Sequence, residues 1–337
     1  MSKALISQRS LLDVYHSRPF IDNDTGLPCV IRNGEQIVVN DGALLRYDEW
    51  KDIDQAVVKA AVDRLSGISA IIGRGLVHNL GSIGVTISQW QEESDMTEAN
   101  YSMSGVTAGE EDTPAYDTAS VPVPVVHKDF RINIRRLEAS RRMGEALDVT
   151  AAATAGRKVA EASEDMLFSS TPIAVGGASI YGFTNFPARN TVVLGTPWDD
   201  LANGVNEVLV EGVRRMIASA IADKFYGPYA LLIPGAYEAK FLEDYRANDS
   251  RTVKQRVLGI DKIQDVIVCD RLTGDNVILV QMTRDVVDLA VAQQISTVSW
   301  SENGGMTNRF KTMAVWVPRL KQDYDGKCGI VHATFSS

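Results

Sequence analysis

The side chains best suited to catalysis or metal binding are scattered along this sequence. The four histidines lie far apart, with no HExxH pair and no second histidine at ligand spacing, so a metal centre is not expected. The three cysteines contain no CxxC pair, which argues against a zinc knuckle or a disulfide framework. We expect the histidines at the surface or at an interface, and the cysteines of the apolar strands as small buried hydrophobes. These residues are His16, His78, His127 and His332, and Cys29, Cys269 and Cys328.

The familiar nucleotide-binding and hydrolytic motifs are also missing. Gly73-Arg74-Gly75 lacks the third glycine and the downstream acidic residue of a dinucleotide fingerprint, and there is no GxxxxGK[ST] loop or GxSxG elbow. The acidic pairs Glu92-Glu93 and Glu110-Glu111 are expected to be exposed, and nothing holds two carboxylates at the separation that acid–base catalysis needs. The sequence therefore predicts a protein that is not an enzyme and has no cofactor and no metal. A long chain without a chemical site favours a role in assembly.

Composition places the chain among soluble globular proteins. Its 337 residues, 45% of them hydrophobic, suffice for about two domains or for one domain with projections. The net charge of −9 argues against wrapping nucleic acid along a basic surface, although it allows a local basic patch. No apolar run approaches the ~18 residues of a membrane span, and no secretory signal is recognisable. We expect a reducing, intracellular setting and no membrane partner.

Charge is sharply segregated between residues 75 and 142. From Gly75 to His127 there are eight acidic residues and no Lys or Arg, whereas Lys128 to Arg142 contains six basic residues against two acidic ones. Most charge runs are simply solvated surfaces, but a separation this clean equally favours a contact between subunits. The candidate contact residues are Glu92, Glu93, Asp95, Glu110, Glu111 and Asp112 on the acidic side, and Arg131, Arg135, Arg136, Arg141 and Arg142 on the basic side.

The acidic segment lies between two predicted strands. Val85–Trp90 and Val121–Val126 both show strand-like alternation, which predicts an extended hairpin. Pro122 and Pro124 confine the returning strand to a sheet edge or to an unpaired course.

The rest of the chain predicts an α+β fold built around a long helix. Alanine-rich residues 147–168 place Leu147, Ala151, Ala155, Val159, Ala162 and Met166 on one face. Further helices are expected at 47–65, 199–221, 237–245 and 252–258. Strands are expected at 35–39, 229–233, 265–270, 277–282, 287–291, 295–299, 310–317 and 329–333, with turn chemistry between them.

Four stretches resemble encapsulin shell proteins, and they keep the chain order of that family from about residue 44 to residue 334. The most specific is FYGPYALLIPGAYEAKFLEDY at 225–245, which is similar to an encapsulin signature. The others are EDMLFSSTPIAVGGASIYGFTN at 164–185, DEWKDIDQAVVKAAVDRLSGISAIIG at 48–73, and DVVDLAVAQQISTVSWSENGG followed by FKTMAVWVPRL at 285–320.

The resemblance implies the Hong Kong 97 fold, which encapsulins share with the major capsid proteins of tailed bacteriophages. It implies an N-terminal arm at 1–46, an N-terminal helix and the start of the peripheral domain at 47–83, and an extended loop at 84–137. The peripheral domain with its spine helix would then occupy 138–195, the axial domain 196–284, and closing strands of the peripheral domain 285–337.

One departure from encapsulins bears on function. About 43 residues precede the helix at 48–65, close to which an encapsulin would begin. An added arm is typical of phage capsid proteins, so we expect a phage major capsid protein that forms pentamers and hexamers in an icosahedral shell around DNA, bound without sequence specificity. The partners would be further copies of the chain and a portal, scaffolding or decoration protein, and the location would be the virion capsid, assembled in the host cytoplasm. The alternatives are an encapsulin shell around protein cargo and a non-capsid oligomeric enzyme or adaptor. Since no lysine lies between Gly75 and His127, we expect no isopeptide cross-link from the extended loop.

Overall fold

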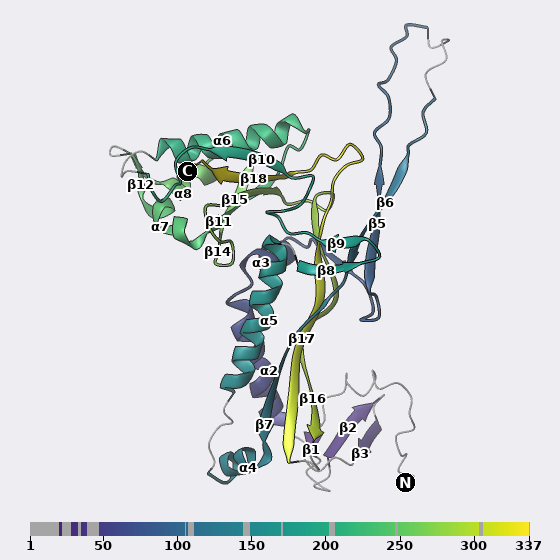
Figure 1. Ribbon diagram of the computed structural model, residues 1–337, viewed down its shortest axis with the longest axis vertical. Helices are drawn as coiled ribbons and strands as arrows, with labels where there is room; N and C mark the ends of the chain where they lie inside the picture. The colour runs from purple at the N-terminus through teal and green to yellow at the C-terminus, as the bar shows by residue number, and fades with distance from the viewer. Residues whose placement is uncertain are drawn as a thin grey trace. The chain divides into compact units, whose positions relative to one another are not determined.

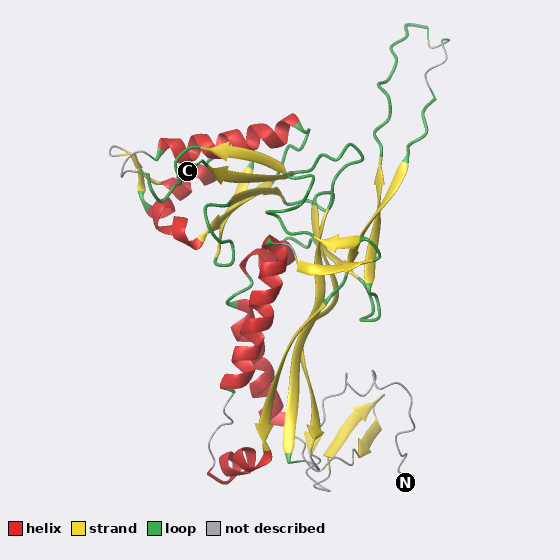
Figure 2. Cartoon of the chain, in the orientation of Figure 1, coloured by secondary structure: helices red, strands yellow, loops and turns green. Residues whose placement is uncertain are grey.

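The computed structural model describes residues 20–21, 28–32, 35–38, 47–104, 106, 111–143, 149–169, 171–201, 206–246, 249–302 and 306–336 (Figures 1 and 2). The chain divides into two compact units. Unit 1 comprises Met1–Arg64, Val125–Ala162 and Gln293–Ala314, and unit 2 comprises Leu65–Pro124, Ser163–Ala292 and Val315–Ser337. Helices and strands mix in the way the sequence predicts for an α+β fold (Figure 2).

In unit 1, helix α2 (Tyr47–Val62) packs against the first part of the long helix α5 (Thr150–Phe168). The two backbones approach closely at Gly156, where an added Cβ would lie 2.7 Å from the carbonyl oxygen of Val57. The apolar face of α2 is buried as its periodicity predicts, with Ile53, Val57 and Ala61 all nearly inaccessible to solvent. Of the face expected on α5, Ala155, Val159 and Met166 are buried, whereas Ala151 and Ala162 are exposed. Leu147 lies outside the described residues.

Strands and one short helix complete unit 1. Strands β1 (Phe20–Ile21), β2 (Pro28–Arg32) and β3 (Glu35–Val38) form an antiparallel sheet. Strand β7 (Val125–Asn133) leads into α4 (Ile134–Met143) and lies beside β17 (Thr307–Leu320), which is paired in turn with β16 (Val287–Glu302). A small core of Ile53, Val57, Ile132, Leu137, Ala152 and Phe310 holds the two helices against these strands.

Strands β16 and β17 are longer than the sequence predicts. Two separate strands are expected at 287–291 and 295–299, yet β16 runs without a break through Gln293 and Gln294. Gln293 is partly covered and Gln294 is exposed, and so polar residues there do not interrupt strand pairing.

The largest core belongs to unit 2 and surrounds a five-stranded sheet. The order of its strands is β10 (Asn190–Leu194), β18 (Ile330–Phe335), β15 (Val277–Gln281), β11 (Tyr229–Pro234) and β14 (Ile263–Cys269). The β10–β18 and β11–β14 pairs are parallel, and the pairs that β15 forms are antiparallel. Helix α6 (Glu207–Ala222) runs along this sheet, with α7 (Glu238–Leu242) and α8 (Val253–Leu258) nearby (Figure 1).

The sheet brings together strands from both sides of the expected boundaries at residues 195 and 284. Residues 330–335, expected among the closing strands, pair with β10 on one side and β15 on the other. Strand periodicity does not predict this pairing, because it identifies a strand but carries no information about its partners.

Two helices differ from expectation. The helix expected at 199–221 begins only at Glu207, because residues 196–201 form turns that bury Trp198 against the rings of Tyr237, Phe241 and Phe335. The helix expected at 237–245 ends at Leu242. The chain then extends into β12 (Asp244–Arg246), which pairs with β13 (Asp249–Thr252). Thr252 caps α8 through a capping box with Gln255.

The predicted hairpin is also part of unit 2. Strands β5 (Ile87–Glu93) and β6 (Tyr116–Pro122) pair in antiparallel register from Ile87 opposite Pro122 to Glu93 opposite Tyr116. Beyond these strands the chain continues as a long loop (Figure 1). The small hairpin of β8 (Thr171–Val175) and β9 (Ala178–Ile180) lies beside β6. Helix α3 (Ser66–Gly73) packs against β14, and β4 (Val77–Asn79) pairs in parallel with β16.

Candidate functional site

The titratable side chains of the described residues do not form a reactive centre. No group of three or more His, Cys, Asp or Glu residues in this part of the chain could hold a metal ion. Cys269 and Cys328 are buried as expected, and burial raises their thiol pKa values to about 12 and about 11, so both thiols stay protonated.

The histidines follow expectation with one exception. His78 and His127 are exposed, and His16 lies outside the described residues. His332 is buried, which contradicts the expected surface position, and burial lowers its pKa to about 4. Its Nε2 lies 2.8 Å from Oδ1 of Asn276, and its Nδ1 accepts a hydrogen bond of 3.3 Å from Nε of Arg189. The neutral ring therefore links β18 to the turn before β15 and to the segment before β10.

The acidic residues of the hairpin loop are mostly at the surface. Glu93, Asp95, Glu111 and Asp112 are exposed, and Glu110 lies outside the described residues. The two sides of the loop are joined near the strands, where Ser94 and Ala115 exchange hydrogen bonds of 2.9 Å. Farther along, Asp112 accepts a bond of 3.0 Å from the backbone of Thr97.

The same loop exposes large apolar side chains. Met96, Tyr101, Met103 and Val106 all lie open to solvent, and Tyr101 and Met103 are covered by nothing in the described chain. Apolar groups gathered on a projecting loop are typical of a surface that another molecule covers.

Glu92 is the one acidic candidate that the structure removes from the surface. Its side chain is 8% exposed and accepts hydrogen bonds of 3.3 Å from the indole N–H of Trp90 and from Nε2 of Gln322. Burial raises its pKa above the ordinary value. The expectation that the Glu92-Glu93 pair is exposed is therefore wrong for Glu92, because strand alternation turns neighbouring side chains to opposite faces.

A buried ion pair lies beneath the hairpin. The guanidinium group of Arg319 on β17 donates two hydrogen bonds to the carboxylate of Asp288 on β16. Arg319 also donates to Oγ of Ser88 at 3.3 Å and lies 5.6 Å from the ring centre of Trp90, both on β5. Lys321 gives Asp288 a further bond of 2.8 Å. Through these contacts the base of the hairpin is fixed to β16 and β17.

The basic candidates lie on two adjacent elements of unit 1. Arg131 is on β7, and Arg135, Arg136 and Arg142 are on α4, all with exposed side chains. Arg141 belongs to α4 by its backbone, and its side chain lies outside the described residues. The acidic candidates belong to unit 2.

A buried carboxylate caps one helix from another in unit 2. Glu164 of α5 accepts hydrogen bonds from the backbone N–H groups of Gly67, at 3.3 Å, and Ile68, at 2.9 Å, at the start of α3. Its side chain is inaccessible to solvent, and burial raises its pKa to about 7. The bonds satisfy backbone donors that a helix N-terminus leaves without partners.

Sequence reasoning missed the buried charges and an arginine-lined pocket. A signal for the ion pair existed, since Asp288 and Arg319 interrupt the apolar runs VVDLA and VWVPRL. The pocket has no local signal, because its residues come from five separate segments.

None of the described helices is long and apolar enough to cross a membrane.

Comparisons with known proteins agree with this architecture. A family model described as "Family of unknown function (DUF6260)" matches residues 40–333. The type 1 encapsulin shell protein of Myxococcus xanthus is 25% identical over 293 residues, which cover 82% of this chain and 90% of that protein. A diheme-cytochrome–encapsulin shell fusion protein of Kuenenia stuttgartiensis is 22% identical over 279 residues, or 82% of this chain and 71% of that protein.

Solved structures establish the fold. The virus-like particle from Pyrococcus furiosus matches with a TM-score of 0.59 and 17% identity, over 86% of this chain and 99% of that one. The capsid of Myoviridae phage XM1 matches with a TM-score of 0.60 and 13% identity, over 81% of this chain and 92% of that one. The expected Hong Kong 97 fold is thereby confirmed.

Proposed function

The chain belongs to the DUF6260 family of unknown function and has the Hong Kong 97 fold, and on these premises we propose that it is the major capsid protein of a tailed bacteriophage. Its role is structural. Copies assemble through pentamers and hexamers into an icosahedral shell around the DNA genome. Assembly takes place in the host cytoplasm, and a portal, scaffolding or decoration protein completes the virion.

The observation that carries the phage assignment is the chain segment ahead of α2. This segment contains the three paired strands β1–β3, whereas the family match begins only at residue 40. The encapsulin resemblance likewise begins close to α2. In the proposed capsid the segment 1–46 is an arm that crosses to an adjacent subunit.

The hairpin at 84–137 is proposed to act as the extended loop between subunits. Strands β5 and β6 pair only with each other in a two-stranded sheet, so their outer edges offer backbone groups to a neighbouring chain. The exposed acidic residues Glu93, Asp95, Glu111 and Asp112, together with Glu110, would face the arginines of β7 and α4 on that neighbour. Glu92 is left out because its carboxylate is buried within its own chain.

The five-stranded sheet with α6, α7 and α8 is proposed as the axial domain that meets its copies at the five-fold and six-fold centres. The domain then includes β10 and β18 in addition to residues 196–284. The remaining elements, with α5 as spine helix, form the peripheral domain.

An encapsulin shell is the second candidate, and the curated sequence relatives favour it. Both relatives described above are encapsulin shell proteins, and one of them is matched over 90% of its length. In this case the shell would enclose protein cargo rather than a genome.

Electron microscopy of the purified protein, with an assay of the particle contents, tests the proposal. Large closed shells, or shells that package DNA in the infected host, are expected for a phage capsid. Small shells that copurify with a cargo protein would replace it with the encapsulin candidate. Discrete dimers or tetramers under all conditions would overturn shell assembly. A denaturing gel of the shells should show monomers, since no lysine lies between Gly75 and His127 to form a cross-link.

A further inference from the structure

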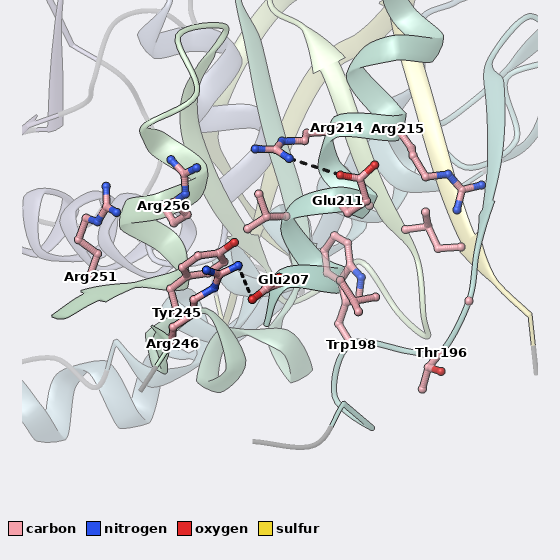
Figure 3. Close-up of a pocket in the computed structure, with 15 residues that line it drawn as sticks. Thr196, Trp198, Glu207, Glu211, Arg214, Arg215, Tyr245, Arg246, Arg251 and Arg256 are labelled. Carbon is pink, nitrogen blue, oxygen red and sulfur yellow. Dashed lines mark hydrogen bonds and ion pairs between the residues drawn. The ribbon is translucent and has the colours of Figure 1, made fainter. Parts of the chain in front are cut away.

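We propose that a pocket in unit 2, between α6, α8 and the β12–β13 hairpin, binds a small polyphosphate anion. The cavity has a volume of about 990 Å³ (Figure 3). Five arginines and two glutamates are the charged residues that line it, which leaves its walls with a net charge of +3. The arginines are Arg214, Arg215, Arg246, Arg251 and Arg256. The site lies in the domain proposed as axial, and it shares no residue with the hairpin loop or with the arginines of β7 and α4.

Arg246 and Arg214 are held in place by ion pairs that use only part of their hydrogen-bonding capacity. Arg246 pairs with Glu207, and Arg214 lies 3.5 Å from Glu211, in ion pairs whose side chains are more than half exposed. Exposed pairs of this kind contribute little and are readily exchanged for a stronger partner. Each guanidinium group carries five N–H donors, and a single carboxylate engages at most two in the bidentate geometry.

Tyr245 organises two of the cations. The guanidinium carbons of Arg246 and Arg256 lie 5.4 Å and 5.8 Å from the centre of its ring. Arg215 is fixed differently, by a hydrogen bond of 3.1 Å to the carbonyl oxygen of Val193. Figure 3 shows Arg214, from α6, and Arg256, from α8, extending into the same space from opposite sides. Like charges gathered in this way repel each other, and a bound polyanion would relieve that repulsion.

Phosphate is the anion that suits these groups best. Guanidinium groups bind phosphate oxygens with two parallel hydrogen bonds, and several phosphates in a row can engage several arginines at once. The aromatic residues indicate that the site does not read a nucleobase, because Tyr245 is already engaged by two cations and Trp198 is buried. A nucleoside triphosphate and inorganic tripolyphosphate should therefore bind through the same three phosphates.

A long nucleic acid fits the site less well. Its backbone needs a continuous track of basic residues, whereas this chain has a net charge of −9 and the five arginines of the pocket line a single concavity. The discrete pocket favours a discrete anion.

Isothermal titration calorimetry of the purified full-length protein tests this inference, with inorganic tripolyphosphate, ATP and AMP as probes. We expect one site per chain, similar affinities for tripolyphosphate and ATP, much weaker binding of AMP, and an affinity that falls as salt rises. Binding of ATP and AMP with equal affinity, or no heat with tripolyphosphate, would overturn the proposal. Tight binding of a short DNA duplex in the absence of tripolyphosphate binding would assign the pocket to nucleic acid instead.

Two variants locate the ligand. Arg256→Gln, on α8, and Arg214→Gln, on α6, should each weaken tripolyphosphate binding by about tenfold, the usual effect of losing one charge-assisted contact. Lys254→Gln is the matched control, because it removes the same charge from the same helix at a residue that does not line the pocket. Equal weakening by Lys254→Gln would mean that tripolyphosphate senses only the overall charge, and the pocket would be rejected as its site.

Discussion

Arg319 and Asp288 face each other from neighbouring strands, with Nε 2.6 Å from Oδ1 and the second nitrogen 2.5 Å from Oδ2. Both side chains are only 5% exposed. Such a pair does not by itself add much stability, but removing one partner leaves a buried charge without its counterion.

Arg319→Met should therefore destabilise the protein by about 3 kcal/mol, the lower end of the range for a broken buried pair, because Lys321 still neutralises part of the charge of Asp288. Urea unfolding of the two proteins measures this cost. The double variant Arg319→Met with Asp288→Leu should recover a large part of the loss. If the double variant is less stable than the single one by the full cost of a second core substitution, the two residues are not coupled.

Glu164 links stability to pH. Since its folded pKa is raised to about 7 from an ordinary value of 4.5, the folded state binds the proton more tightly than the unfolded state does. The resulting stabilisation is complete below pH 4.5 and is lost as the pH rises to about 7, at most about 3 kcal/mol. Glu164→Gln should remove this slope. Melting temperatures of both proteins from pH 4.5 to 8 test it, and a constant difference between them would contradict the expected titration.

His332 acts in the opposite direction. Its pKa in the folded state is lowered to about 4, so the unfolded state binds the proton more tightly. The contribution of the neutral ring to the free energy of unfolding is therefore present above pH 6.5 and is lost as the pH falls toward 4. His332→Gln keeps a side chain that can bond to both Asn276 and Arg189 and should remove the loss on the acid side. The stability of the variant relative to the wild type is thus expected to rise as the pH drops from 6.5 to 4. A wild type and variant that lose stability in parallel over that range would refute a titrating His332.

Gly156 is required by the approach of α2 to α5. Alanine favours a helix over glycine by about 1 kcal/mol, yet its Cβ would lie 2.7 Å from the backbone oxygen of Val57. Gly156→Ala should therefore destabilise the protein by about 1–3 kcal/mol, as overpacking does. Gly73→Ala is the control, because nothing lies within 4 Å of its added Cβ. Thermal unfolding distinguishes them, and equal effects would mean that the helices can separate at no cost.

The proposed contact between subunits predicts an assembly defect. Arg135→Glu with Arg136→Glu should yield free capsomers, because the altered surface repels the acidic loop of its neighbour. Lys51→Glu with Lys59→Glu changes the charge equally on the exposed face of α2 and should leave shells intact. Size-exclusion chromatography and microscopy give the readout. Normal particles from the arginine variant would rule this pairing out.

Glu111→Lys with Asp112→Lys offers a rescue. If the two surfaces meet, this pair of changes should restore shells when it is combined with the arginine variant in the same chain. Failure of the combination to assemble, while the acidic variant alone does assemble, would place the loop on a different surface.

Local sequence patterns predicted many of the helices and strands, but they did not predict features that depend on contacts between segments far apart in the sequence. The buried face of α2 and the helix α8 follow from periodicity, which acts between near neighbours. The hairpin was also expected, although its returning strand is Tyr116–Pro122 and not Val121–Val126. The start of α6 could not be read in the same way, because the burial of Trp198 depends on rings supplied by α7 and β18. Glu92 was misplaced for a related reason, since its partner Gln322 lies 230 residues away.

The position of β18 constrains the order in which this protein can fold. The strand lies between β10 and β15, and residues 331–335 pair with 190–194, more than a hundred positions earlier. Until β18 has left the ribosome, β10 has no partner in the sheet and β15 exposes an open edge. The nascent chain therefore cannot complete this sheet before β18 has emerged, and sheets that depend on such distant pairing close slowly. During that delay the incomplete sheet is accessible to chaperones, before the folded subunit can assemble with other copies.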